Sequence, residues 1–556
     1  MGILYAFVMA ATAWWLWIVR PSLEERGRHE AAAWAKSAAI AAALLVIPAF
    51  SARGVGELLA GWVAATLFIN FWRNIWGWLL NQLSLSGQEG DTRAHLRGAR
   101  LVDGPTLQKI LKNEAADLTI GGQKFPARIE NLHLLITGAT GTGKSVAISE
   151  MLDAIQERGD RVFLSDSGGN ALKHYYSPER GDVVLNPLDA RAVSWSPLAE
   201  MAQAWDADLL AKSIVPDGEG SSKEWNGYAQ AVASAILKHC WNLDLNNAEI
   251  FRLAVVADIG ELREIFAFAG TPAQALVAEG NERMFGSIRG IVGTYLTPFQ
   301  YLDPAAGKNA WSLKKFVEDD RAKGWLFFNF RDDQLATLAP VIAAMTDVVS
   351  KSILSLDADP SRRFWLVLDE FASLGKVTSI LDFLTKARKA GGRAIIGIQT
   401  VAQLRSAYGR DDAQTLLSCL SSQLVLRCPD PETADLMSRM LGEEQIVRQV
   451  GSGGESKKIL EATTTTENWQ EQVATERVVM PAELQNLPDL RGVLNLAGNI
   501  PAAPVQLQPI DRPKIAETYV AGQAREIKIS KVASAQEQQQ NQPQPDRDMT
   551  GDLDLI

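Results

Sequence analysis

The chain has 556 residues and a formal net charge of −10, a length that predicts two or three compact units with a large buried core. The acidic balance excludes a surface coated in basic patches, so any nucleic acid must be bound in a local groove or channel. The cysteines (Cys240, Cys419 and Cys428) and the 5 histidines show no metal-ligand spacing, and so few cysteines exclude a disulfide framework.

Near the N-terminus, three apolar runs carry no charged residue, namely Ile3–Val19, Ser37–Ala52 and Leu58–Trp72. Tryptophans crowd the ends of these runs, where indole rings favour the membrane interface. Each run is close to the lower length limit for a spanning helix, so residues 1–80 are predicted to form a transmembrane anchor of two or three helices. A set of buried core helices is the alternative interpretation.

The distribution of basic residues bears on the orientation of this anchor. The first connection holds Arg20, Arg26, Arg28 and Lys36, whereas the second holds only Arg53. The positive-inside rule places the first connection in the cytoplasm, so three spans would leave the N-terminus outside and residues after about 80 inside. Two spans with a cytoplasmic N-terminus would also put the later residues inside, but would send the first group of basic residues outward.

Residues 81–130 are mixed in composition, with a basic patch at Arg93, Arg97 and Arg100, and they are expected to form a solvated or headgroup-facing linker. A nucleotide-binding domain is predicted to begin near Asn131. Residues 132–145 read LHLLITGATGTGKS, in which the glycines, lysine and serine have the spacing of a P-loop. Such a loop binds phosphate through its backbone N–H groups. The expected cradle comprises Gly138, Ala139, Thr140, Gly141, Thr142, Gly143, Lys144 and Ser145.

The context of this motif is the one a P-loop requires. A strand-like run, Leu132–Thr137, precedes it, a helical pattern follows over Val146–Glu157, and a second strand, Arg161–Leu164, leads to Asp166. Lys144 is expected to reach the β- and γ-phosphates of ATP, and the Ser145 hydroxyl to bind Mg²⁺.

Further strands are expected at Asp182–Leu185 and Trp325–Phe330, with an alanine-rich helical pattern between about Pro197 and Pro298. The simplest interpretation is an all-α domain (197–298) inserted into an α/β domain made of residues 131–196 and 299–510. The remaining residues, 511–556, become rich in Gln, Pro and acids, and are predicted to form a disordered tail.

The stretch WLVLDEFASLG (365–375) ends a buried strand on two carboxylates, Asp369 and Glu370, which need a cation nearby. Two more buried strands follow, Ala394–Ile398, which delivers Gln399, and Ser422–Arg427. Alternating strands and helices predict a mainly parallel sheet, whose carboxyl ends bring Lys144, Asp369, Glu370 and Gln399 together.

Asp369 is expected to hold Mg²⁺ directly or through water, and Glu370 to polarise the attacking water as a general base. Gln399 is placed to sense the γ-phosphate or to orient the same water, or else simply satisfies a strand end. Arg388, in the helix end TKARKAGG, is the candidate cation that would act in the site of a neighbouring subunit. The alternative for Arg388 is a solvated helix-end charge.

The P-loop, LDEFASLG, GGRAIIGIQTVAQL and the N-terminal runs together resemble the type IV secretion coupling proteins of the TraG/TraD group, over roughly residues 1–510. The resemblance implies a RecA-like P-loop ATPase of the bacterial inner membrane, with its ATPase domain cytoplasmic, which assembles as a homohexamer and pumps single-stranded DNA with its attached relaxase. It implies relaxosome proteins and inner-membrane secretion components as partners, a substrate-recognising helical insert, and an arginine finger at Arg388.

Two departures from the family pattern stand out. The usual anchor has two spans, not three, and Asp166-Ser167-Gly168-Gly169 replaces an Asp-Pro-Lys-Gly motif.

Candidates for DNA contact in the insert are Lys212, Lys223 and Trp225. A receptor that binds ATP for assembly and mainly recruits substrate is the alternative to a motor, and a chromosome-segregating DNA pump of the same fold is a rival enzyme.

Overall fold

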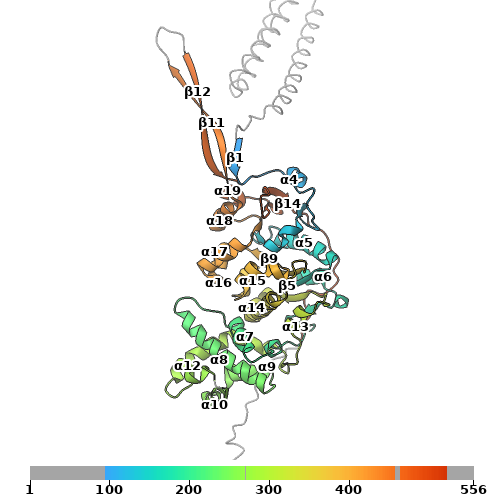
Figure 1. Cartoon of the computed structure of the whole chain (residues 1–556), viewed down its shortest axis with the longest axis vertical. Helices are drawn as coiled ribbons and strands as arrows, with labels where there is room; N and C mark the ends of the chain where they lie inside the picture. Colours follow the sequence, from blue (N-terminus) through green and yellow to red (C-terminus); the bar gives the residue numbers. More distant parts are fainter. Residues whose placement is uncertain (1–93, 270, 457–463, 523–556) are drawn as a thin grey trace, which may run out of the picture. The chain divides into compact units, whose positions relative to one another are not determined.

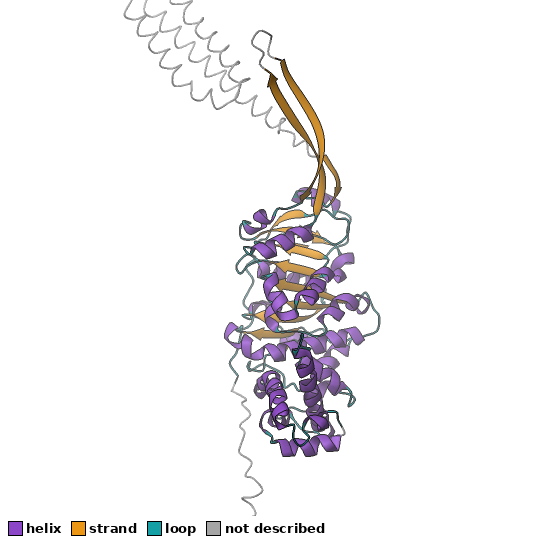
Figure 2. Ribbon diagram, turned by 90° about the vertical axis from the view of Figure 1, so that its left-hand side faces the viewer, coloured by secondary structure: helices purple, strands orange, loops and turns teal. Residues whose placement is uncertain are grey.

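The computed structural model describes residues 94–269, 271–456 and 464–522. Within this part of the chain, a nine-stranded sheet carries helices on both faces (Figures 1 and 2). All neighbours from β10 to β6 are parallel, whereas β13 runs antiparallel to both β10 and β14. The strands in spatial order are β14 (Ala503–Gln506), β13 (Arg491–Asn495), β10 (Ser422–Val425), β4 (Leu134–Thr137), β9 (Gly392–Ile398), β8 (Phe364–Leu368), β5 (Arg161–Ser167), β7 (Leu326–Phe330) and β6 (Val183–Val184).

The seven parallel strands include every strand expected from the sequence, and the α/β class is confirmed. Their continuous apolar runs arise because both faces of the sheet are covered. In β8, for example, Leu366 and Leu368 belong to one core cluster while Trp365 and Val367 belong to the other. Successive side chains of a strand point to opposite faces, so a strand covered on both sides needs no polar alternation.

The two clusters are built with different helices. One face is covered by α4 (Gly104–Ile110), α5 (Lys144–Arg158) and α6 (Asn170–Tyr175). The other is covered by α14 (Asp332–Ser355), α15 (Ile380–Lys386), α16 (Val401–Tyr408), α17 (Arg410–Cys419), α18 (Pro431–Leu441) and α19 (Pro481–Gln485). Short turns of 3-10 helix are η1 (Ala127–Leu132), η2 (Pro178–Arg180), η3 (Pro197–Glu200), η5 (Thr297–Tyr301), η6 (Phe371–Leu374) and η7 (Ala387–Ala390).

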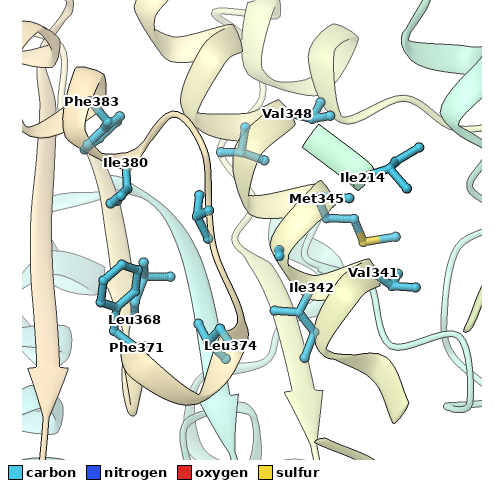
Figure 3. Close-up of a cluster of buried hydrophobic side chains, with 14 of the residues drawn as sticks. Ile214, Val341, Ile342, Met345, Val348, Leu368, Phe371, Leu374, Ile380 and Phe383 are labelled. Atoms are coloured by element: carbon cyan, nitrogen blue, oxygen red, sulfur yellow. The ribbon is translucent and has the colours of Figure 1, made fainter. Parts of the chain in front are cut away.

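Helix α14, which the sequence analysis did not foresee, is central to the second cluster. Figure 3 shows Ile342 and Met345 of α14 on the side of the cluster opposite Leu368, Phe371 and Leu374, which belong to the end of β8 and the turn after it. Among the described helices, α14 alone is long and apolar enough to cross a membrane, and 72% of its apolar window is buried inside the protein. Its apolar character is accounted for by this core position.

Between β6 and β7 the described residues form helices and turns without a strand, and Figure 1 shows most of these helices gathered in green beyond the edge of the sheet. They are α7 (Asp206–Ile214), α8 (Ser222–Asn242), α9 (Asn247–Phe251), a π-helical turn (Arg252–Val256), α10 (Ile259–Ala269), α11 (Ala273–Leu276) and α12 (Glu282–Leu296). The chain returns to the sheet through α13 (Leu313–Glu318). Helix α14 contacts α7 as well as strands β5 and β7, so one long helix packs against both the sheet and the helical region.

Part of the stretch expected to be a solvated linker is folded. After α4, the strands β2 (Leu118–Ile120) and β3 (Gln123–Phe125) form an antiparallel pair. Leu118, Ile120 and Phe125 are buried, and β2 contacts α5. The linker interpretation was wrong for these residues. Each strand has only three residues, too few for buried and exposed side chains to form a recognisable alternating pattern in the sequence.

A three-stranded sheet contains β1 (Ala94–Gly98), β11 (Glu443–Ser456) and β12 (Thr464–Arg477), none of which was expected from the sequence. Residues Ile446–Ala474 belong to a different compact unit from residues 96–445 and 475–522, which contain the nine-stranded sheet. The predicted membrane spans of residues 1–80 lie outside the described residues.

The first part of the predicted disordered tail is ordered. Residues 508–522, here called the strap, follow β14, and Arg512 pairs with Asp153 of α5. Further along, the Thr518 carbonyl accepts a hydrogen bond from Asn329 of β7, and Gly522 donates to the Leu188 carbonyl. The tail prediction therefore fails for residues 511–522, and residues 523–556 lie outside the described part.

One buried histidine joins two strands of the sheet. His133 precedes β4 with a φ of 63°; its Nε2 lies 3.0 Å from the Leu384 carbonyl, and its Nδ1 accepts from the Ala394 N–H at 3.1 Å. Burial lowers the pKa of His133 to about 4. Because its unfolded pKa is about 6.5, the neutral ring contributes stability above that pH, and this contribution is lost as the pH falls towards 4.

We expect His133→Asn to flatten this part of the pH dependence. Asn tolerates the left-handed backbone, and its Oδ1 can accept from Ala394 N–H without titrating. The measurement is the free energy of unfolding by denaturant at several pH values between 7 and 4, for both proteins. Equal slopes for the two proteins over this range would contradict the assignment.

Candidate nucleotide site

The Gly-rich loop leaves β4 between the ends of its two neighbours. The Gly138 N–H donates to Ile398 of β9 at 3.2 Å, and the Ala139 N–H donates to Arg427, which follows β10, at 3.0 Å. Gly143 has a φ of 117°, which disfavours any residue with a side chain. The loop opens directly into α5, so its N–H groups and the helix N-terminus face the same place.

One anchor of the loop was missed by sequence reasoning. The Thr142 carbonyl accepts from the N–H of Leu490, a residue with a φ of 62° just before β13. A Cβ built on Gly143 would lie 3.1 Å from a side-chain carbon of Leu490 and 3.0 Å from one of Leu507. No local sequence signal marks Leu490, since its role depends on the antiparallel return of β13.

Lys144 is only 6% exposed, and its Nζ donates to the Gly138 carbonyl at 2.8 Å. Burial lowers the pKa of Lys144, while the charges of Asp369 and Glu370 oppose that shift. The lysine is therefore folded back along the loop, and its charge is felt by the carboxylate pair that ends β8.

The structure brings Ser145 of the P-loop together with three side chains that the sequence places at strand ends, Asp369, Glu370 and Gln399. The Ser145 hydroxyl lies 3.5 Å from Asp369 Oδ2, and Gln399 Nε2 donates to Glu370 Oε1 at 2.6 Å. Asp369 and Glu370 follow β8, Gln399 follows β9, and Ser145 is the second residue of α5, which follows β4. The contacts therefore join the ends of three neighbouring parallel strands. Glu370 adopts a left-handed φ of 55°, which is uncommon for a residue other than glycine.

Asp369 lies in a crowded position. Burial raises the pKa of Asp369, with Glu370 adding to the shift and Lys144 opposing it, so a further cation beside it would be stabilising. A Cβ built on Gly397 of β9 would lie 3.0 Å from Asp369 Oδ1. This glycine was not singled out from the sequence, although a glycine inside a buried strand often marks a close approach of another group.

The Asp166 carboxylate accepts hydrogen bonds at the start of a helix. Its two carboxylate oxygens accept from the N–H groups of Ala171 and Leu172 at 3.1 and 2.8 Å, at the start of α6. Burial raises the pKa of Asp166 to about 7. Gly168, which stands where the family pattern has Lys, has a φ of 75°, a conformation that lysine would adopt only with strain.

Arg388 is not brought to the P-loop of its own chain. It is exposed in η7, just before the amino end of β9, whereas the loop lies at the carboxyl ends of the strands. It lines a surface hollow together with Asn131, Lys386 and Lys389. Lys212, on α7, and Lys223, on α8, are exposed, and Trp225 is 37% exposed against Tyr228.

A family model described as the type IV secretion-system coupling protein DNA-binding domain matches residues 117–508. The chain belongs to the type IV secretion-system coupling proteins. Among solved structures, the bacterial conjugative coupling protein TrwB is similar, with 35% identity and a TM-score of 0.69 over 77% of this chain and 97% of that one. TrwB has also been solved in complex with ADP and Mg²⁺ and with a non-hydrolysable ATP analogue.

Curated coupling proteins match over shorter shares of their own length. TraD of Escherichia coli K12 is 27% identical over 476 residues, which cover 83% of this chain and 64% of TraD. VirD4 of Agrobacterium fabrum C58 is 24% identical over 342 residues, which cover 56% of this chain and 50% of VirD4. The chain thus spans half to two thirds of the length of these two relatives. The family and the RecA-like α/β fold agree with the resemblance seen in the sequence.

The close approach of Gly397 to Asp369 makes a testable prediction for this coupling protein. Asp369 is the expected Mg²⁺ ligand, and Gly397→Ala would displace its carboxylate. Disturbing the surroundings that orient such a ligand typically costs about 10- to 100-fold in metal affinity. We expect the Mg²⁺ concentration needed for nucleotide binding to rise by about that factor, measured by titration with a fluorescent ATP analogue. Gly286→Ala on α12, where a Cβ meets nothing within 4 Å, is the matched control. Unchanged Mg²⁺ dependence in Gly397→Ala would contradict the prediction.

Proposed function

We propose that this chain is a Mg²⁺-dependent ATPase that couples the relaxosome to a type IV secretion channel and translocates single-stranded DNA with its attached relaxase. The observation that carries the proposal is the pair of contacts at one sheet edge, Ser145 with Asp369 and Gln399 with Glu370. A protein that only recruited substrate would have no need of a glutamate held beside a second polar side chain at the end of the P-loop sheet. The family match supports DNA as the substrate class.

The residues fit Mg²⁺ and ATP. In the part of the chain that the structure describes, no group of three His, Cys, Asp or Glu side chains could hold a metal alone. Mg²⁺ is commonly held by one carboxylate, a hydroxyl and the phosphates of its nucleotide, which is the set that Ser145 and Asp369 would complete. The N–H groups of residues 138–145 and the Lys144 ammonium would bind the phosphates, whose remaining charge a Mg²⁺ ion held at Ser145 and Asp369 would offset.

The proposed roles of the other two side chains follow from their contact. Glu370 accepts a proton from the attacking water at its carboxylate, and Gln399 fixes the direction of that carboxylate. Because Gln399 also ends the strand next to the P-loop strand, it can contact the γ-phosphate or the same water. The two residues together orient the nucleophile.

In this proposal, Arg388 acts in the nucleotide site of a neighbouring subunit. Its position at the amino end of β9, remote from its own P-loop, suits a residue that completes the site of the next subunit in a homohexameric ring. An arginine supplied in this way contributes about 10³- to 10⁵-fold in rate in other phosphoryl-transfer enzymes.

The remaining parts of the proposal concern location and partners. The apolar N-terminal runs favour a multi-pass anchor in the bacterial inner membrane, with the ATPase domain in the cytoplasm. Its partners are single-stranded DNA, the relaxase and relaxosome proteins, and inner-membrane components of the secretion system. The helical region at 197–298 recognises substrate, with Lys212, Lys223 and Trp225 as candidate DNA contacts.

The decisive test measures ATP turnover by the full-length protein in lipid nanodiscs, with and without single-stranded DNA, beside Glu370→Gln. We expect DNA to stimulate turnover, and Glu370→Gln to abolish it while leaving ATP binding intact, because the amide cannot accept a proton. ATP binding without turnover in either condition would replace the motor with a receptor that uses ATP for assembly.

The trans role of Arg388 predicts complementation between two inactive proteins. Arg388→Ala and Glu370→Gln are each expected to lose more than about 10²-fold in turnover. Mixed assemblies would contain interfaces with one intact Arg388 facing one intact Glu370, so mixing should restore part of the activity. Lys386→Ala, which removes a neighbouring charge from the same hollow, is the control. Mixtures as inactive as their components would contradict a trans arrangement.

A further inference from the structure

The two segments that begin at Glu370 and Gln399 separate and then meet again. Glu370 leads into η6 and the turn Gly375–Ser379, while Gln399 leads into α16, whose last residue is Tyr408. The ring of Phe371 stacks on that of Tyr408, with ring centroids 5.1 Å apart and an interplanar angle of 25°. The two segments are therefore closed into a loop, with the contact between Glu370 and Gln399 at one end and Tyr408 at the other.

The Tyr408 hydroxyl strengthens this closure. It accepts from the N–H of Val377 at 3.0 Å and donates to the carbonyl of Gly375 at 3.4 Å. Tyr408 is 2% exposed, and its burial raises the pKa of the phenol, so the hydroxyl stays neutral and can donate and accept at once. One side chain of α16 thus fixes both the aromatic residue next to Glu370 and the turn that follows.

Glu370 needs such support because its backbone is strained. A non-glycine residue with a φ of 55° persists only where its surroundings hold it. Its immediate neighbour Phe371 is 1% exposed and lies beside Leu368 in the cluster of Figure 3. A side chain that seats Phe371 therefore also determines where the Glu370 carboxylate points.

We propose that Tyr408 is a positioning residue that holds Glu370 against Gln399 through Phe371 and the turn Gly375–Ser379. The proposal rests on the hydrolysis proposed above, in which Glu370 activates water. Tyr408 itself touches neither nucleotide nor water in this role. It acts on the rate of hydrolysis and leaves nucleotide binding to the P-loop.

The test compares Tyr408→Leu and Tyr408→Phe with the full-length protein in nanodiscs. Tyr408→Leu removes both the stacked ring and the hydroxyl, and misplacing a catalytic group by about 1 Å can cost up to about 100-fold in rate. We expect its kcat for ATP to fall by about 10- to 100-fold with KM and the Kd for an ATP analogue unchanged. Tyr408→Phe keeps the ring, so its kcat should lie between those of Tyr408→Leu and the parent protein.

Two controls separate this role from a general loss of packing. Phe266→Leu removes a fully buried ring from α10, in the helical region, and should lower thermal stability without changing kcat. Glu370→Gln tests the proposed chemistry itself. A parent protein that does not hydrolyse ATP would contradict the proposed function, which is a different failure from that of the positioning role. If Glu370→Gln is inactive while Tyr408→Leu keeps the parent kcat, the positioning role is wrong. A Tyr408→Leu protein that loses nucleotide affinity in step with kcat would also overturn it.

Discussion

The site depends on one electrostatic constraint, which is that β8 ends in two adjacent carboxylates at the edge of a buried sheet. Burial raises the pKa of Asp369, and the charge of Lys144, which is folded back along the P-loop, opposes that shift. Glu370 has a left-handed backbone, and its carboxylate accepts from Gln399. A glycine at 397 leaves room for the Asp369 carboxylate beside β9.

The same segment also joins the candidate site to the helical region. Beyond η6, the Thr378 hydroxyl donates to the carbonyl of Lys212 in α7 at 3.2 Å, and the Ser379 N–H donates to Asp347 of α14 at 2.6 Å. Asp347 is fully buried and also accepts from Ser213 of α7, so it links three elements through one carboxylate. Loss of the hydrogen bond from Ser213 or from Ser379 would leave the buried Asp347 carboxylate less well satisfied. The carboxylate therefore favours one fixed arrangement of α7, α14 and the turn after η6.

The sequence predicted what is local and left out what depends on distant pairing. The P-loop, the strand ending at Asp369 and Glu370, and the strand ending at Gln399 carry short signals that physical chemistry makes readable: glycines at phosphate spacing, and charge at the end of an apolar run. Leu490 and Tyr408 carry no such signal, because each matters only through a neighbour brought close by the fold. Gly397 carries only the general signal of a glycine inside a buried strand, which does not say what approaches it. The strap was taken for part of a disordered tail because its contacts are hydrogen bonds and an ion pair with distant residues, which composition does not reveal.

The strand order has a consequence for how the protein is made. The P-loop strand β4 ends at Thr137, yet the strands on its two sides, β9 and β10, begin at Gly392 and Ser422. During synthesis β4 must therefore wait, with both edges unpaired, until most of the domain has been translated. Such non-local pairing slows folding and exposes apolar strands to aggregation. A chain interrupted before residue 392 would contain every phosphate-binding residue and still lack both strands that pair with β4.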